Sequence, residues 1–208
     1  MTGTRRSYDA VAERYAAEFG TELDGKPLDR ALLALVVELA AGGLIADVGA
    51  GPGLITGHLT RLGGRTVAVD LSPAMCALAP RPGVCADMAR LPLAADRVSA
   101  IVCFYAVIHL DAAQRAHAYA EFARVLRPGG HALIAFHVSD PDHVPGGTVE
   151  RTEWWGEDVD LVFRFLAPGE EADAMGRAGL RVTAQLDRSP HPGVEHPSRR
   201  AYLLAQRP

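Results

Sequence analysis

The stretch LIADVGAGPGL, residues 44–54, decides the fold of this chain. Its first half, residues 44–48, is short and mostly apolar, which predicts a buried β-strand. Gly49, Gly51 and Gly53 follow at once, and glycine is needed where the backbone must bend sharply and let a ligand come close. The stretch therefore predicts a strand that ends in a ligand-binding turn and continues into a helix.

The spacing of these glycines disfavours a nicotinamide dinucleotide as the ligand. In the dinucleotide fingerprint, a third glycine stands five residues after the first. Counted from Gly49 that place is Leu54, and counted from Gly51 it is Thr56. The turn is therefore of a different kind.

Outward from this stretch, short apolar runs alternate with longer segments of helical period. That alternation predicts a doubly wound α/β fold with a parallel sheet. Pro128-Gly129-Gly130 reads as a turn before the fifth strand, and residues 181–186 are expected to pair antiparallel with residues 201–205. The predicted parallel strands are residues 44–48, 66–70, 84–86, 100–104 and 131–137. The predicted helices of this part are residues 53–62, one capped by Ser72, one from Asp111 to Arg127, and residues 168–178.

Two helices are expected ahead of the first strand. Residues 8–19 carry apolar and aromatic side chains at three- and four-residue spacings, and a second helix begins near Pro27 and stops at Gly42-Gly43. From residue 138 to about 160 the apolar periodicity lapses. We expect that segment to be an excursion over the edge of the sheet.

Length and composition predict one domain over residues 1–208. The chain is 49% apolar and 22% charged, and its formal charge of −4 comes from acids and bases mixed along its length, which argues against a nucleic-acid partner. No run reaches the roughly 18–20 apolar residues of a membrane span. The N-terminus has no apolar signal-peptide core, so we expect a cytoplasmic protein with no membrane partner, as a monomer or homodimer. Three widely spaced cysteines predict reduced thiols.

Four motifs occur in the order of one known family. Residues 47–53 resemble the first motif of class I S-adenosylmethionine-dependent methyltransferases, of the small-molecule type similar to the ubiquinone and menaquinone biosynthesis enzymes. Residues 67–72, with Asp70 at the end of the second strand, resemble the next motif. Residues 87–93 and the turn at 124–130 resemble two more. One departure is Ser99, where the family often has an acid.

The resemblance implies a Rossmann-like seven-stranded sheet, mostly parallel with an antiparallel edge strand. It implies S-adenosylmethionine as cofactor, S-adenosylhomocysteine as product and a small-molecule acceptor. Asp70 would hold the ribose hydroxyls, and the backbone carbonyl of Phe104 the methionine amine. The expected cofactor-binding residues are Tyr8, Tyr15, Asp47, Gly49, Ala50, Gly51, Gly53, Asp70, Leu71, Asp87, Met88 and Phe104. Residues 1–43 would cover the cofactor, residues 44–137 bind it, residues 138–166 form an acceptor lid, and residues 167–208 complete the sheet.

Tyr8 and Tyr15 belong to the pattern Tyr-Asp-x-x-Ala-x-x-Tyr, which resembles small-molecule members whose first helix covers the cofactor. Their spacing of seven places both rings on one helix face. Either ring could reach the methionine end, and plain packing against the core is an equally good interpretation.

Two histidines are candidates for the base. A neutral histidine titrates close to working pH, and His109 follows the fourth strand while His137 ends the fifth. His109 is interpreted as the base or as a hydrogen-bonding residue that positions the acceptor. The alternatives are a histidine satisfied by its neighbours at His109 and a solvent-facing side chain at His137.

Four further residues are candidates for acceptor binding: Tyr105, Trp154, Trp155 and Arg200. The tryptophans would form part of the lid, or else pack in the core or a dimer interface. Arg200 could meet an acceptor carboxylate or phosphate, and a solvated charged hairpin is the more ordinary interpretation.

No metal-ligand constellation and no Asn-Pro-Pro-Tyr-type tetrapeptide after the fourth strand is found. We therefore expect metal-independent methylation of an oxygen or nitrogen of a small metabolite. The alternatives are a protein of the same fold that binds the cofactor without methylating, or a scaffold that binds none.

Overall fold

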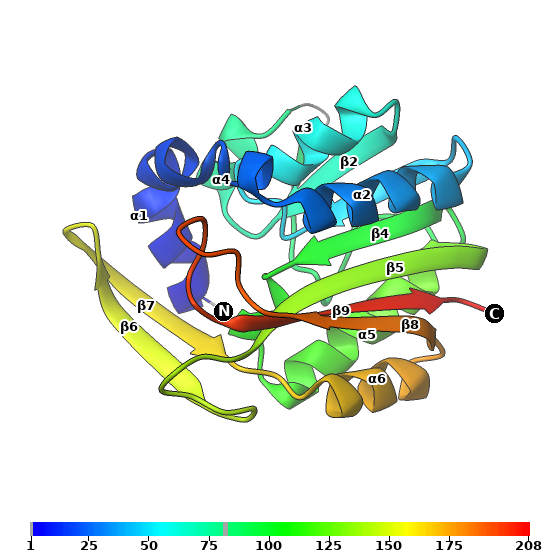
Figure 1. Cartoon of the computed structure of the whole chain (residues 1–208). Coiled ribbons are helices and arrows are strands. Elements are labelled where there is room, and N and C mark those ends of the chain that lie inside the picture. The colour runs from blue at the N-terminus through cyan, green and yellow to red at the C-terminus, as the bar shows by residue number, and fades with distance from the viewer. Residues whose placement is uncertain (1, 81–82) are drawn as a thin grey trace.

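The computed structural model describes residues 2–80 and 83–208 and has a seven-stranded sheet in the order β3-β2-β1-β4-β5-β9-β8 (Figure 1). The five strands from β3 to β5 pair in parallel. Their bounds are Leu44–Val48 for β1, Arg65–Asp70 for β2, Gly83–Cys85 for β3, Val98–Phe104 for β4 and Leu126–Ser139 for β5. The strand order reverses between β1 and β4, which is where a doubly wound sheet opens a ligand crevice at its carboxyl edge.

Helices cover both faces of this sheet (Figure 1). One core cluster joins Leu33 and Val36 of α2 to Leu59 of α3, and the other joins Phe122 of α5 to Met175 of α6. Both predicted caps form, because Ser72 accepts from the Met75 N–H and Asp111 makes a capping box with Gln114. The helices are α1 (Thr2–Phe19), α2 (Pro27–Ala40), α3 (Leu54–Arg61), α4 (Pro73–Leu78), α5 (Ala112–Val125) and α6 (Pro168–Arg177).

The chain ends in the antiparallel pairing that the sequence predicts. β9 (Arg199–Gln206) runs antiparallel between β5 and β8 (Arg181–Arg188), so β8 forms the edge of the sheet. The expected seven-stranded, mostly parallel sheet with antiparallel pairing at this edge is confirmed. The predicted turn at Pro128-Gly129-Gly130 lies inside β5, where the pairing with β4 jumps from Leu126 to His131 and the intervening residues bulge out.

Residues 148–164 are more regular than the sequence predicts. They form a two-stranded antiparallel hairpin of β6 (Thr148–Trp154) and β7 (Glu157–Arg164), separate from the main sheet. β6 has few buried positions, so its side chains lack the apolar alternation that would have revealed a strand. The hairpin projects beside α1 at one end of the sheet (Figure 1).

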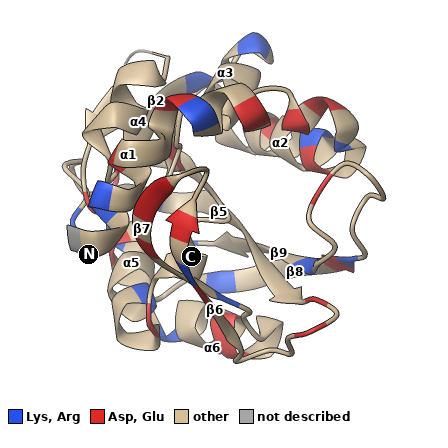
Figure 2. Cartoon of the chain, turned by 90° about the vertical axis from the view of Figure 1, so that its left-hand side faces the viewer, with Lys and Arg blue, Asp and Glu red and all other residues tan. Residues whose placement is uncertain are grey.

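Charges of the two signs are intermixed along the ribbon, for example on α2 (Figure 2). Across residues 2–80 and 83–208, no helix has the length and apolar character needed to cross a membrane.

Candidate functional site

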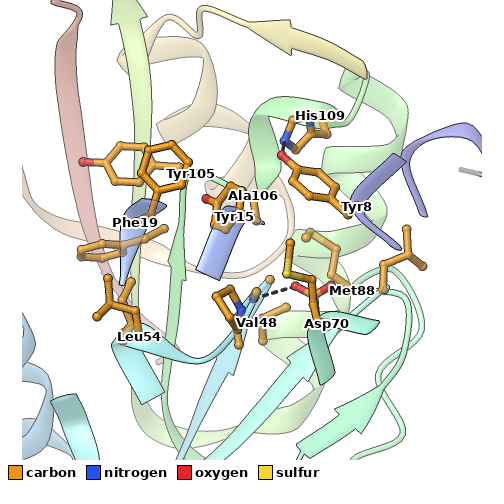
Figure 3. Close-up of a pocket in the computed structure, with 18 of the residues that line it drawn as sticks. Tyr8, Tyr15, Phe19, Val48, Leu54, Asp70, Met88, Tyr105, Ala106 and His109 are labelled. Atoms are coloured by element: carbon orange, nitrogen blue, oxygen red, sulfur yellow. Dashed lines mark hydrogen bonds between the residues drawn. The ribbon is translucent and has the colours of Figure 1, made fainter. Parts of the chain in front are cut away.

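A cavity opens at the carboxyl ends of β1, β2 and β4, with α1 across it (Figure 3). The glycine turn and the ends of these strands form its floor, and aromatic side chains of α1 form the opposite wall. This is the crevice expected at the strand-order reversal. Of the residues predicted to bind a cofactor, those that line the cavity are Tyr8, Tyr15, Gly49, Ala50, Gly51, Asp70, Leu71, Asp87, Met88 and Phe104.

The glycine turn has the backbone that the sequence requires. Gly49, Gly51 and Gly53 all have positive φ, at 75°, 54° and 84°. A Cβ on Gly49 would come 2.2 Å from the Ala106 Cβ, so a side chain would be strained there and would clash. A Cβ on Gly51 would meet nothing within 4 Å. The turn therefore presents bare backbone to open space, where a ligand can approach closely.

Asp70 is fixed at the end of β2, beside that turn. Its Oδ2 accepts from the Gly51 N–H at 2.8 Å and its Oδ1 from the Ser72 N–H at 2.8 Å. Burial raises the pKa of this carboxyl, and the backbone hydrogen bonds oppose that rise. Each oxygen keeps a further lone pair for a donor in the cavity, such as a ligand hydroxyl.

Asp47 lies outside the cavity lining, so the structure does not support its prediction as a cofactor-binding residue. It is buried beneath the turn, and its Oδ2 accepts from the Thr56 hydroxyl at 2.6 Å. Burial raises the pKa of Asp47 to about 7, although the bond from Thr56 lowers it. Asp47 therefore ties β1 to α3 and supports the turn from below. Gly53 also lies outside the cavity lining, against Pro80 and Ala79.

Past β3, Asp87 and Met88 form the next wall. The Asp87 Oδ1 accepts from the Ala89 N–H at 2.9 Å, which fixes its carboxylate at the start of a tight turn. Met88 offers an apolar surface next to Leu71 and Ala86. A polar oxygen beside an apolar ledge suits a planar heterocycle with an amino group.

At the end of the cavity toward the hairpin, Tyr8 of α1 and His109 point at each other (Figure 3). The Tyr8 hydroxyl lies 2.7 Å from His109 Nε2, and His109 Nδ1 lies 3.0 Å from the Val162 carbonyl of β7. Burial lowers the pKa of His109 to about 4, so the ring is neutral near pH 7. His109 does line the cavity. Its prediction as a base assumed a ring that titrates near working pH, and burial moves the pKa of His109 below that range.

His137 lies behind the cavity wall, so the structure does not support its prediction as a second base. Its ring stacks on Tyr105 at 5.0 Å between centroids, and its Nδ1 lies 2.7 Å from the Ser198 hydroxyl. Burial and the charge of Arg200 lower the pKa of His137 to about 3. The alternative of a solvent-facing histidine is not supported either, because this side chain is partly buried and its ring stacks on Tyr105.

Trp154 and Trp155 pack behind the tyrosines of α1. The two indoles stack at 4.5 Å, and Trp154 lies edge-on to Tyr15 at 5.8 Å while Trp155 contacts Phe19 at 5.9 Å. Neither indole lines the cavity itself. They support its aromatic wall from outside, whereas Tyr105, the other predicted aromatic of the acceptor site, lines it directly.

Arg200 lies outside the cavity lining, so the structure does not support its prediction as an acceptor-binding residue, and because it is buried it is not part of a solvated hairpin. Its side chain is 2% exposed, forms an ion pair with Glu195 at 3.2 Å and donates to the Ser198 carbonyl at 2.7 Å. The guanidinium also lies over the Tyr105 ring at 5.6 Å. Arg200 therefore supports Tyr105 from below, as His137 does.

Several cavity residues come from segments where no motif marked them. Phe19 follows Tyr8 and Tyr15 on the same helix face, so its helical spacing was the available signal. Lys26, which precedes α2, is buried between Glu22 at 2.8 Å and Glu195 at 3.1 Å, and no local pattern predicts its contact with Glu195. The lining residues that the sequence did not single out include Thr4, Phe19, Glu22, Leu23, Lys26, Asp29, Leu54, Ile55 and Met75. Among the residues described, no three His, Cys, Asp or Glu side chains are placed to hold a metal ion.

The chain is similar in sequence to known proteins. A family model described as a methyltransferase domain matches residues 46–134. The biotin biosynthesis bifunctional protein BioHC of Cellvibrio japonicus is 30% identical over 188 residues, covering 86% of this chain and 34% of that protein. The demethylmenaquinone methyltransferase of Thermobifida fusca is 27% identical, covering 88% and 79%. The chain thus spans about a third of the first relative and most of the second.

Among solved structures, the chain resembles the 1,6-didemethyltoxoflavin-N1-methyltransferase of Burkholderia thailandensis. The TM-score is 0.69 with 20% identity, over 98% of this chain and 90% of that one. The similarity to that structure establishes the shared fold.

Proposed function

Because the chain belongs to the class I S-adenosylmethionine-dependent methyltransferases, we propose that it moves a methyl group from that cofactor to an oxygen or nitrogen of a small molecule, without a metal ion. The observation that carries the proposal is the fixed Asp70 carboxylate beside the bare backbone of the glycine turn, inside one aromatic-walled cavity. A carboxylate held in this way suits a pair of ribose hydroxyls.

The residues present fit the cofactor. Asp70 would accept from the ribose hydroxyls, Asp87 and Met88 would receive the adenine, and the Phe104 carbonyl would accept from the methionine amine. Gly51 leaves open space next to Asp70 for the part of the ligand that lies against the turn. When bound, the cofactor supplies a methyl group already activated by a positively charged sulfur.

The protein's part is then to align the acceptor with that methyl group and to keep water out. Tyr8, Tyr15 and Phe19 form the wall of the cavity that faces the glycine turn, with Trp154 and Trp155 packed behind them. We propose that this wall, α1 with the β6–β7 hairpin, covers both ligands. The hairpin would thus act as the acceptor lid that the sequence predicts within residues 138–166.

A small acceptor fits the names of the relatives. The Thermobifida relative is named for demethylmenaquinone and the Burkholderia structure contains 1,6-didemethyltoxoflavin, and neither of these is a protein or a nucleic acid. For this chain an aromatic-walled cavity supports the same class of acceptor.

Methyl transfer is tested with S-adenosylmethionine labelled with carbon-13 at its methyl group, incubated with a panel of small hydroxyl and amine compounds. We expect a labelled product and S-adenosylhomocysteine in equal amounts, and neither with Asp70→Ala. Binding of the cofactor without any methylated product would instead favour a protein of this fold that uses the cofactor for another purpose.

A further inference from the structure

The hydrogen bonds around His109 fix which of its ring nitrogens carries the proton. The Val162 carbonyl can only accept, so Nδ1, 3.0 Å away, must be the N–H donor. In a neutral ring, Nε2 is then a bare acceptor. The Tyr8 hydroxyl, 2.7 Å from Nε2, therefore donates its only proton to His109.

This arrangement gives the Tyr8 oxygen a defined polarity in the cavity. With its proton committed to His109, the oxygen offers only lone pairs to anything else. Tyr8 and His109 both line the cavity, near Ala106 and Tyr15 (Figure 3). A polar group that meets the Tyr8 oxygen there must be a hydrogen-bond donor, such as an O–H or N–H.

We propose that the methyl acceptor is an aromatic hydroxyl compound, and that Tyr8 takes the hydroxyl proton while passing its own proton to His109. This inference rests on the proposed methyl-transfer function. The new bond joins the acceptor oxygen to the methyl carbon, and the carbon–sulfur bond breaks with its electron pair left on sulfur. The acceptor proton goes to the Tyr8 oxygen, the Tyr8 proton goes to His109 Nε2, and the imidazolium later releases its Nε2 proton to solvent.

Acid strength favours a hydroxyl over an amine. As the methyl–oxygen bond forms, the hydroxyl becomes a protonated ether, a far stronger acid than any imidazolium, so even a weakly basic His109 can receive its proton. A methylated aliphatic amine remains protonated, because its pKa stays near the roughly 10.4 of a lysine. Burial leaves the pKa of His109 at about 4, too low to take a proton from such a group.

The shape of the cavity favours an aromatic ring. Five phenylalanine and tyrosine rings line it, from Tyr8, Tyr15, Phe19, Phe104 and Tyr105. Flat apolar walls with few polar groups bind planar apolar ligands, and the polar groups then set the orientation.

The charged groups around Tyr8 and His109 come from several elements. Arg164 of β7 donates to the His109 carbonyl at 2.9 Å, and its charge helps to lower the pKa of His109. Burial raises the pKa of Tyr8 well above the ordinary value, Tyr15 of α1 and Asp70 at the end of β2 add to that rise, and Arg151 of β6 opposes it. Tyr8 is therefore neutral at rest and stays a donor to His109. The hairpin holds His109 through both Val162 and Arg164.

The experiment compares 1-naphthol with 1-naphthylmethylamine, which carry the same ring system with an aromatic hydroxyl or an aliphatic amine as the nucleophilic group. Both are offered to the enzyme with S-adenosylmethionine, and their binding to the S-adenosylhomocysteine complex is followed by naphthalene fluorescence. We expect methylation of 1-naphthol in preference to 1-naphthylmethylamine. We also expect a solvent deuterium isotope effect on that turnover, because two protons move with the methyl group.

Tyr8→Phe keeps the ring and removes the hydroxyl. We expect it to slow 1-naphthol methylation about 100-fold, the range of general acid–base catalysis, and to abolish the solvent isotope effect while S-adenosylhomocysteine still binds. The matched control is Tyr119→Phe, which removes a buried hydroxyl bonded to Glu171, away from the cavity. It should keep both the rate and the isotope effect.

His109→Gln tests the positioning residue behind Tyr8. It should also abolish the isotope effect, and nitrogen-15 NMR of the wild-type complex should show His109 protonated at Nδ1. Preferred methylation of 1-naphthylmethylamine, full 1-naphthol turnover by Tyr8→Phe, or a complex that binds neither naphthalene would overturn this inference. Failure of the wild type to bind S-adenosylhomocysteine would overturn the proposed function instead.

Discussion

Asp47 supports the glycine turn from beneath through a buried hydrogen bond. It lies beneath the glycine turn with Thr56 as its hydrogen-bond partner, and burial raises its pKa to about 7. An acid whose pKa is higher in the folded state binds a proton more tightly there. Its contribution to stability is therefore present at low pH and is lost as the pH rises from about 4 to about 7.

Asp47→Asn should remove this pH dependence. The amide is neutral at every pH and can still accept from Thr56. Between pH 4 and pH 7, the free energy of unfolding of the wild type should fall relative to the variant, by at most about 1.4 kcal/mol per pH unit. Urea unfolding at several pH values measures this difference. Parallel curves for the two proteins would contradict the assignment of a buried, protonated carboxyl.

Gly49 is required for two separate reasons, its positive φ and its contact with Ala106. Gly63 has a positive φ of 87° but open space around it, so it provides a matched control. We expect Gly63→Ala to cost about 1 kcal/mol from backbone strain alone. Gly49→Ala should cost a further ~1–3 kcal/mol from overpacking and should also abolish binding of S-adenosylhomocysteine. Equal losses in urea unfolding would show that the contact with Ala106 does not matter.

At the scale of elements, α1 is held over the cavity from both sides. The Asp9 Oδ1 accepts from the Ser72 hydroxyl at 2.6 Å and the Ala74 N–H at 3.2 Å, at the start of α4. On the other side, the Ser7 hydroxyl accepts from the Asp160 N–H of β7 at 2.7 Å. The wall of the cavity is thus fastened next to Asp70 and to the hairpin.

Asp9→Ala should loosen α1 from the ribose side of the cavity. Loss of such a hydrogen-bond acceptor costs about 1 kcal/mol, so we expect a small drop in stability together with faster proteolysis within α1. Asp173→Ala on the exposed face of α6 is the control and should change neither. Binding of S-adenosylhomocysteine should slow the proteolysis of both variants. Unchanged cleavage in Asp9→Ala would mean that the other contacts of α1 suffice.

Sequence patterns predict some elements of this fold and miss others. Buried parallel strands such as β1 and β4 are continuous apolar runs, and glycine, proline and capping residues mark the ends of their helices, so the central sheet was predictable. The β6–β7 hairpin was not, because an exposed strand has no apolar alternation. The same holds within the site. Asp70 and the glycines follow from a local motif, whereas the contact of Tyr8 with His109 joins residues 101 positions apart.

At the scale of the whole molecule, one carboxylate joins the loop between β8 and β9 to the start of α2. The Glu195 side chain is fully buried and contacts Lys26 at 3.1 Å, Arg200 at 3.2 Å and Arg188. Burial opposes its charge, but the hydrogen bonds from Arg188 prevail and lower the pKa of Glu195 to about 2. This network closes the cavity at its Tyr105 end.

Glu195→Gln should destabilise the protein by about 3 kcal/mol, because it leaves buried cations without a partner. The loss should be complete at neutral pH and should shrink as the pH falls from about 4.5 to about 2, where the wild-type carboxylate takes up its proton. The exposed Glu150→Gln is the control, and urea unfolding measures both. A loss of similar size in the two variants would contradict the network.

The proposed methyl transfer depends on the cofactor site, and calorimetric titration with S-adenosylhomocysteine tests that site most directly. The wild type and the exposed control Asp187→Asn should bind it equally. Asp70→Asn, which keeps the shape of the side chain and removes its charge, should bind roughly 10- to 100-fold more weakly, as expected for loss of charged hydrogen bonds. No binding by the wild type, or equal binding by Asp70→Asn, would contradict the proposed cofactor site.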